Sequence, residues 1–191
     1  MKMKVPSPAL LLLLAAASAA DAAAQQRKPA PEPPAKASEC TATMGELPKA
    51  WDGQAFALDG DTLVGTGLRP HLRLWGIQAP ELRDAAKAES GPGMRARAWL
   101  ADLLAKADHK VKCRPARFDH ECRLVAQCSV GDAGGAIDLA GSLLAAGMAY
   151  GGGDLGEALP WESRAGQRYA DAEFEARKGR KGLWPLWLGD R

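Results

Sequence analysis

Two short segments carry side chains whose types and spacing could do chemistry together. Asp59 and Asp61 flank a glycine in a tight turn, and Arg73 and Glu81 follow, eight residues apart. Carboxylate oxygens bind hard cations such as Ca²⁺, a guanidinium binds phosphate, and a glutamate takes a proton from water. These residue types in this order indicate metal-assisted hydrolysis of a phosphodiester bond.

Each of these residues also has an ordinary structural explanation. An Asp-Gly pair is first of all a turn signal, and Arg73 inside a strand can pair with Glu81. Arg123, further along the chain, can be a charge on the face of a hairpin. The structural explanation is the better one for any residue alone, but the ordered set favours a phosphate site.

The elements that must position these residues begin with strands and then mix in helices. Alternating and apolar runs predict strands at 54–58, 62–64, 71–77, 111–118 and 123–130. Helical spacing predicts helices at 92–106, 138–146 and 161–178, with Asp138 as the N-cap of the second. This order predicts an α+β fold with a small antiparallel barrel rather than a parallel βαβ sheet.

The first part of the chain is typical of an exported protein. A basic start and an apolar run at 9–20 precede small-x-small sites, which predicts a signal peptide at 1–24. The run is shorter than the ~20 residues of a membrane span, so no stable membrane anchor is expected after cleavage. Residues 25–38 contain four prolines and predict an extended linker, and residues 40–191 have the length of one domain.

Net charge does not indicate a strongly basic nucleic-acid-binding protein. The full chain carries +2, and removal of residues 1–24 takes away two lysines and one aspartate and leaves +1. Any contact with nucleic acid must therefore rest on local groups of basic residues, such as Arg69, Arg73 and Arg83.

The even set of four cysteines predicts disulfides in an exported chain. If Phe118 faces Arg123 across the predicted hairpin, Cys113 lies directly opposite Cys128, and the two can form a bridge. Cys40 and Cys122 then remain, and their pairing would brace the hairpin loop. No CxxC or paired Cys/His spacing is present, which argues against a zinc site.

The same segments carry a resemblance to a known family. The matching positions are Asp59-Gly60-Asp61-Thr62-Leu63, Arg73-Leu74, Gly76-Ile77, Pro80-Glu81, Asp119, Arg123-Leu124-Val125-Ala126 and Gly182-Leu183-Trp184. On these residues, from about 51 to 187, the chain resembles the thermonuclease (staphylococcal nuclease-like) family. The resemblance implies an OB-like five-stranded antiparallel β-barrel with three helices.

The resemblance also implies a role for each site residue. The residue matching Asp61 ligates Ca²⁺, with Asp59 in support. Arginines matching Arg73 and Arg123 hold the scissile phosphate, and a glutamate matching Glu81 activates the attacking water. Two permanently charged guanidiniums stabilise the charge that gathers on the pentavalent phosphate, and the metal neutralises a further oxygen.

Gln78 departs from this pattern, because the family usually places an aspartate there as a second charged calcium ligand. The glutamine side chain still offers a carbonyl oxygen, as does the backbone of Ala79, but one negative charge is lost. Asp84 and Glu121 are the two carboxylates that could replace it. The sequence therefore predicts weakened or lost Ca²⁺ binding.

Together these observations predict an exported, Ca²⁺-dependent hydrolase, a phosphodiesterase or endonuclease that acts on DNA or RNA in the periplasm or outside the cell. An alternative from another class stays open: a catalytically weakened nuclease fold that serves as a binding or scaffold module in the periplasm. Gln78 and the near-neutral charge favour the alternative. Glu81 favours the enzyme, because a pure binder does not need a general base.

Overall fold

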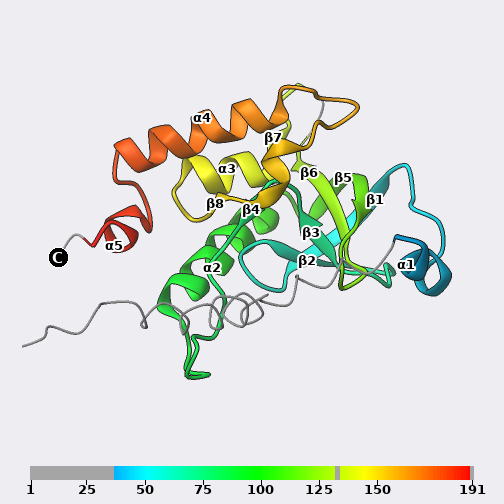
Figure 1. The fold of residues 1–191 in the computed structure, drawn as a ribbon, viewed down its shortest axis with the longest axis horizontal. Coiled ribbons are helices and arrows are strands. Elements are labelled where there is room, and N and C mark those ends of the chain that lie inside the picture. Colours follow the sequence, from blue (N-terminus) through cyan, green and yellow to red (C-terminus); the bar gives the residue numbers. More distant parts are fainter. Residues whose placement is uncertain (1–36, 132–133, 190–191) are drawn as a thin grey trace, which may run out of the picture. The chain divides into compact units, whose positions relative to one another are not determined.

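The computed structural model describes residues 37–131 and 134–189 of the chain. The predicted signal peptide at 1–24 and residues 25–36 of the predicted linker lie outside these ranges. The helices are α1 (Ala37–Met44), α2 (Gly91–Lys106), α3 (Leu139–Ala145), α4 (Ala165–Lys178), α5 (Trp184–Trp187) and the 3₁₀ helix η1 (Gly153–Gly156) (Figure 1). The strands are β1 (Trp51–Ala57), β2 (Thr62–Gly65), β3 (Leu72–Leu74), β4 (Ile77–Gln78), β5 (Lys110–Phe118), β6 (Leu124–Val130), β7 (Ile137–Asp138) and β8 (Tyr150–Gly151).

Five of the strands close into a barrel. β1 pairs with β2 and β5, β2 pairs with β3, and β5 pairs with β6, all antiparallel. A parallel pairing of β3 with β6 closes the ring, so the fold is the expected α+β barrel with a mixed rather than wholly antiparallel sheet. The parallel pair arises because α2 and β5 lie between β3 and β6 in the chain, and a long connection lets a strand return in the same direction.

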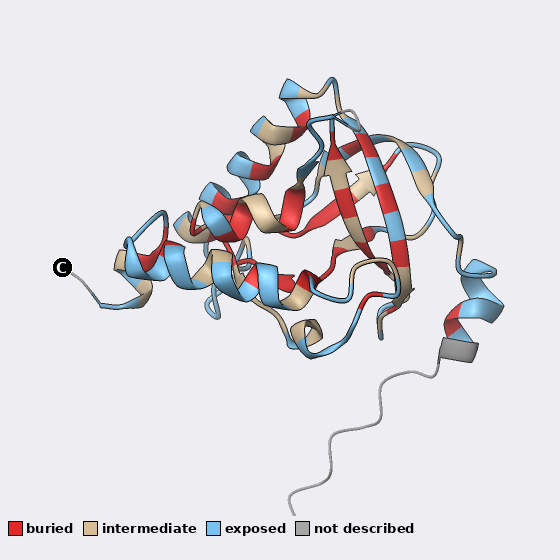
Figure 2. Cartoon of the chain, turned by 90° about the horizontal axis from the view of Figure 1, so that it is seen from above, coloured by how far each residue is buried: buried red, intermediate tan, exposed pale blue. Residues whose placement is uncertain are grey.

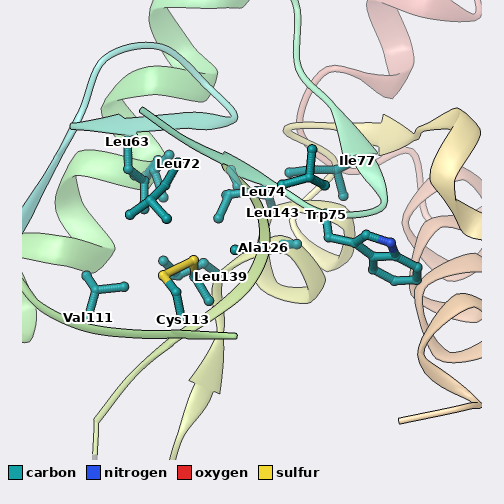
Figure 3. Packing of buried hydrophobic residues seen from close by; sticks show 14 of the residues in the cluster. Leu63, Leu72, Leu74, Trp75, Ile77, Val111, Cys113, Ala126, Leu139 and Leu143 are labelled. Carbon is teal, nitrogen blue, oxygen red and sulfur yellow. A yellow bond between two sulfur atoms is a disulfide. The ribbon is translucent and has the colours of Figure 1, made fainter. Parts of the chain in front are cut away.

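Alternate positions of the strands fill the barrel interior. Leu72 and Leu74 of β3 are fully buried, in one cluster with Leu63 and Val111 (Figure 3). Burial of each leucine contributes about 1.5–3 kcal/mol. Because neighbouring residues of a strand point to opposite faces, Arg73 between the two leucines points away from the interior. The packing of β3 thus determines the face on which the arginine lies.

Helices α2, α3 and α4 each bury one side and expose the other (Figure 2). In α2 the buried positions Ala96, Leu100 and Leu104 recur every fourth residue, which is the spacing of one helix face. α3 packs against both α4 and β6. Within residues 37–131 and 134–189, no helix is long and apolar enough to cross a membrane.

The strand predicted at 71–77 is divided in the structure. A turn at Trp75 and Gly76 separates β3 from β4. The fully buried indole of Trp75 points out of the barrel toward α4, where its ring centre lies 5.4 Å from that of Tyr169 (Figure 3). The chain turns here with Gly76 at a φ of 77°, and the indole packs under the helices.

The helices also differ in part from the predictions. The helix predicted from residue 161 begins at Ala165, because the Trp161 indole donates a hydrogen bond to the Gln127 side chain at 2.7 Å and the preceding segment forms a turn. α1 was not predicted, and it begins at Ala37, inside the segment assigned to the linker.

The hairpin of β5 and β6 contains the expected cross-strand disulfide between Cys113 and Cys128. Its register differs from the one assumed, because Phe118 faces Leu124 and not Arg123. A β-bulge between Pro115 and Arg117 shifts the register by one residue. The bulge lies between the cysteine pair and the hairpin loop, so it displaces Phe118 but leaves Cys113 opposite Cys128.

Asp138 joins the helices to one another. As predicted, it is the N-cap of α3, where its carboxylate accepts a hydrogen bond from the Gly141 N–H at 3.0 Å. The same carboxylate accepts from the Tyr169 hydroxyl at 2.7 Å and from Arg168 Nη2 at 2.8 Å. Tyr169 is fully buried, so its hydroxyl depends on this one acceptor residue for its hydrogen bond.

Replacement of Asp138 tests this arrangement. Asp138→Ala removes the cap and leaves the buried Tyr169 hydroxyl without its acceptor, so we expect a loss of about 2–4 kcal/mol in the free energy of unfolding. Asp138→Asn keeps an acceptor and should lose roughly half as much. Urea denaturation measures both, with the exposed Asp171→Ala on α4 as control. Equal midpoints for Asp138→Ala and Asp171→Ala would contradict the role of Asp138.

Candidate active site

A cleft of about 1010 Å³ opens beside the barrel, between β3, β4, the loop after β5 and η1. Its lining includes every residue that the sequence assigned to the site: Asp59, Asp61, Arg73, Gln78, Ala79, Glu81 and Arg123. It also includes three charged residues that the sequence did not single out: Arg117, Asp154 and Glu157. The fold therefore brings the predicted set together in one concave surface.

The Asp-Gly-Asp turn is organised by Asp59. Its Oδ1 accepts hydrogen bonds from the backbone N–H groups of Asp61 at 2.9 Å and Thr62 at 2.7 Å. Gly60 is required for close approach, because a Cβ there would lie 2.5 Å from the Cβ of Ala79 and 2.7 Å from that of Ala96. The turn explanation of this motif is thus confirmed, and the turn presents Asp61 to the cleft.

Asp61 is buried and its carboxylate has several partners. Oδ1 accepts from Arg73 Nη1 and from the Thr62 hydroxyl, and Oδ2 accepts from the Ala79 N–H at 2.7 Å. Arg73 also donates through Nη2 to the carbonyl of Ile77 at 3.2 Å. Arg73 therefore pairs with Asp61 rather than with Glu81, the partner that a structural explanation had suggested.

Burial and neighbouring charges act on the pKa values at this end of the cleft. Burial raises the pKa of Asp59, and the negative charge of Asp61 adds to the rise against the backbone hydrogen bonds that lower it. Burial alone would lower the pKa of Arg73, but the charges of Asp61 and Asp59 outweigh it, so the pKa is raised. Arg73 stays cationic, and a second positive charge placed near the two aspartates would relieve their repulsion.

Glu81 stands on the exposed rim beside the first turn of α2. The helix comes close because residue 93 is glycine: a Cβ there would lie 2.1 Å from the carbonyl oxygen of Glu81. Ser90 caps the helix by accepting from the Gly93 N–H at 3.2 Å. The backbone of Glu81 is therefore held by α2, while its side chain reaches solvent and the cleft.

The loop after β5 positions Arg123. Asp119 Oδ1 accepts from the N–H groups of Glu121 and Arg123, each at 2.9 Å, and Oδ2 accepts from Arg123 Nε at 2.7 Å. Cys122 in this loop has a φ of 57° and is bonded to Cys40 of α1, the second of the two expected disulfides. A carboxylate and a covalent link to α1 thus hold this loop at the edge of the cleft.

The oxygen atoms beside Arg73 are of the kind that a divalent cation takes. Asp59 and Asp61, which carry carboxylates, and Gln78 and Ala79, which carry carbonyl groups, line the same cleft. Among the described residues, no three His, Cys, Asp or Glu side chains gather closely enough to hold a metal by themselves. Oxygen donors of this type are the ones that a hard ion such as Ca²⁺ takes, and here both oxygens of Asp61 also accept hydrogen bonds from Arg73, Thr62 and Ala79.

The two carboxylates considered as a replacement for the missing charge differ in their position relative to the cleft. Asp84 lies outside the cleft lining, and its Oδ1 accepts from the N–H groups of Ala86 and Ala88 in its own turn. Glu121 lines the cleft, but it forms an ion pair with Arg123 Nη1 at 3.1 Å. Gln78 itself is exposed on β4 and brings no charge.

The cleft lining contains more carboxylates than guanidinium groups. Its charged residues are the carboxylates Asp59, Asp61, Glu81, Asp119, Glu121, Asp154 and Glu157 and the guanidiniums Arg73, Arg117 and Arg123. Each of the three arginines forms an ion pair with at least one of these carboxylates. An anionic ligand would therefore have to take the place of a carboxylate beside an arginine, and a bound cation would favour that exchange.

Comparison with known proteins finds one family whose model matches most of the described domain. The model of a family described as staphylococcal nuclease homologue matches residues 71–185. The match contains the cleft residues from Arg73 to Glu157, including Glu81 and Arg123, and begins after Asp59 and Asp61. A search of the curated proteins finds no match to the chain.

The Asp119 carboxylate gives a pH-dependent prediction. Burial alone would raise its pKa, but hydrogen bonds from Arg123 and the charge of that residue lower it below the ordinary value of 3.8. A lowered pKa in the folded state contributes stability above the pKa of the unfolded chain, and the contribution disappears as pH falls through the folded value. Asp119→Asn should therefore destabilise the protein by about 1–3 kcal/mol near neutral pH and by progressively less below about pH 4.

Thermal or urea unfolding across this pH range measures the difference between Asp119→Asn and the unsubstituted protein. The exposed Asp102→Asn, which removes only a surface pair with Lys106, is the matched control and should change little. A difference for Asp119→Asn that does not depend on pH would show that its charge is not what holds the loop.

Proposed function

Since the chain belongs to the family of staphylococcal nuclease homologues, we propose that it is an exported nuclease that hydrolyses phosphodiester bonds of DNA or RNA with Ca²⁺. One observation carries the proposal: Arg73, Arg123, Glu81 and the buried Asp61 line a single cleft. A binding surface needs the arginines, whereas the carboxylate on the rim and the buried aspartate are the parts that hydrolysis adds.

In the proposed reaction, Arg73 and Arg123 bind the non-bridging oxygens of the scissile phosphate. Glu81 takes the proton from a water whose oxygen forms a new bond to phosphorus. The bond from phosphorus to the leaving ester oxygen then breaks, and that oxygen takes a proton from solvent. The two guanidiniums stabilise the extra negative charge on phosphorus through planar, permanently charged groups that donate paired hydrogen bonds.

Asp61 and Asp59, with the carbonyl oxygens of Ala79 and Gln78, are the proposed ligands of Ca²⁺. The ion would supply positive charge to neutralise a phosphate oxygen. Asp61 has a second role in this proposal, because it holds Arg73 through Nη1 until the phosphate arrives. Phosphate and carboxylate compete for the same guanidinium, so Asp61 keeps Arg73 oriented and also limits its affinity for phosphate.

A second candidate function is supported by Gln78. This residue is exposed and uncharged at the position where a third carboxylate would strengthen cation binding. If the remaining ligands are too weak, the cleft serves as a binding module for phosphate-bearing partners in the periplasm, with the arginines intact and hydrolysis lost.

Export is supported by the two disulfides, because such bonds persist in oxidising compartments. The proposed route is the signal peptide at 1–24, followed by release into the periplasm or outside the cell.

A nuclease assay separates the two candidates. Oxidised protein is incubated with single-stranded and double-stranded DNA and RNA in the presence of Ca²⁺, Mg²⁺, Mn²⁺ or EDTA. We expect cleavage with Ca²⁺, and a loss of about 10²–10⁴-fold in Glu81→Gln, because the general base is removed. Glu46→Gln, at an exposed glutamate outside the cleft, should cleave at the unsubstituted rate. Binding of these nucleic acids by folded protein without cleavage under any of these conditions would favour the binding module.

Gln78→Asp tests the proposed cation site directly. The substitution adds one carboxylate to the donor set, and we expect roughly tenfold tighter Ca²⁺ binding, which is about 1.4 kcal/mol. Isothermal titration with Ca²⁺ in the absence of nucleic acid measures the affinity. Gln54→Asp, an exposed glutamine on β1 outside the cleft, adds the same charge elsewhere and serves as control. Equal affinities in the two variants would place the cation away from Gln78.

A further inference from the structure

Arg117 faces the cleft because of the bulge in β5. Along this strand Val111, Cys113 and Pro115 are buried, whereas Lys112 and Arg114 are exposed. Continued alternation would turn residue 117 into the barrel, where a guanidinium has no partner. The bulge between Pro115 and Arg117 inserts one residue, so that Phe118 takes the buried position and Arg117 lines the cleft.

The pairing of the strands places Arg117 in one row with Arg73. Val125 of β6 pairs with Arg117 on one side and with Arg73 on the other. Paired residues of neighbouring strands have their side chains on the same face of a sheet, and all three residues line the cleft. Two strand spacings, about 10 Å, separate the backbones of the two arginines, with the buried valine as the floor between them.

Arg117 is paired across the cleft with carboxylates from η1 and the residue after it. Its Nη2 forms an ion pair with Asp154, and its Nε donates to Glu157 at 3.3 Å. The Arg117 side chain is 36% exposed, and those of Asp154 and Glu157 are 21% and 58% exposed. Ion pairs with this exposure contribute little to stability, typically about 0–1 kcal/mol. A structural role alone therefore does not account well for a bulge that redirects an arginine into the cleft.

The geometry points to Arg117 as a third phosphate-binding residue, which contacts a phosphate next to the scissile one when that phosphate displaces Asp154 and Glu157. This inference rests on the proposed function, because it extends the same cleft along a nucleic-acid strand. It specifies the substrate as a chain with consecutive phosphates rather than an isolated phosphodiester. Arg73 and Arg123 bind the phosphate that reacts, and Arg117 binds the phosphate next to it in the strand.

The carboxylates paired with Arg117 distinguish a phosphate-binding residue from one that only forms a structural ion pair. If Arg117 binds phosphate, Asp154 competes with the ligand, so removal of the aspartate frees the guanidinium and tightens binding. If the pair only fixes η1 to the barrel, removal of either partner loosens the cleft and weakens binding. Substitutions at Arg117 and Asp154 therefore have opposite effects in the first case and the same effect in the second.

The experiment measures binding of fluorescein-labelled single-stranded tetranucleotides, one of DNA and one of RNA, by fluorescence anisotropy with Ca²⁺. All variants carry Glu81→Gln so that the probe stays uncut. Arg117→Gln should raise Kd about tenfold or more, because a charge-assisted contact is lost, and should reduce the slope of log K against log salt by about 0.7. Asp154→Asn should lower Kd several-fold. Arg114→Gln, exposed on the same strand outside the cleft, should change Kd less than twofold.

A double-mutant cycle excludes simple repulsion by Asp154 as the cause. The gain from Asp154→Asn should shrink in the Arg117→Gln background, because the freed guanidinium is no longer present. A second probe, a dinucleotide with one phosphodiester and no terminal phosphate, should bind equally to the unsubstituted and Arg117→Gln forms. If Arg117→Gln does not fold, Arg117→Lys keeps the charge but not the planar fork, and it should still weaken binding of the tetranucleotide.

The inference is overturned if Arg117→Gln and Asp154→Asn both weaken binding, if Arg117→Gln leaves Kd unchanged, or if neither probe binds. Failure of the proposed function is recognised separately, in the cleavage assay of protein with Glu81 intact. Binding that depends on Arg117 without cleavage would support the inference and reject hydrolysis. Cleavage together with tetranucleotide binding that is independent of Arg117 would support hydrolysis and reject the inference about Arg117.

Discussion

The pairing of Arg73 with Asp61 is the interaction on which the cleft depends. Arg73 can face the cleft because Leu72 and Leu74 on either side of it are buried in the barrel. Asp61 can meet it because Asp59 folds the preceding turn and because the Ala79 N–H donates a hydrogen bond to the Asp61 carboxylate. One carboxylate thereby connects β2, β3 and β4, the three segments that form one side of the site. Charge pairing here organises the backbone before any ligand is bound, which is a form of preorganisation.

Much of this arrangement follows from local rules that a sequence displays. Strand alternation in β3 places the Arg73 side chain on the opposite face of the strand from Leu72 and Leu74. The preference of aspartate for N-cap positions identifies Asp138 as the N-cap of α3. The order of the acidic turn, the arginines and the glutamate predicted which residues would share a cleft. These features depend on neighbours in the chain, so pattern and chemistry together are enough to find them.

The features that the sequence did not reveal depend on residues far apart in the chain. Phe118 was assigned to the wrong partner because a bulge leaves the composition of β5 unchanged, and Arg117 was missed for the same reason. A charged residue at an inward position of an otherwise alternating strand was the available signal. The turn at Trp75 depends on Tyr169, which is contributed by α4 much later in the chain. Long-range packing of this kind overrides strand propensity, and one sequence does not display it.

The two disulfides enclose overlapping stretches of chain, and both stretches contain residues that line the cleft. The bond from Cys40 to Cys122 spans 82 residues and encloses the exposed segment after Glu81, and the bond from Cys113 to Cys128 encloses the Asp119–Cys122 loop. A protease that cut the backbone once in either exposed stretch would leave the fragments covalently joined, with the barrel strands still paired. The folded protein would then be nicked without being separated into pieces, and the cut would become visible only after reduction. Cross-links placed around the site thus let the oxidised protein tolerate single cuts in these exposed loops.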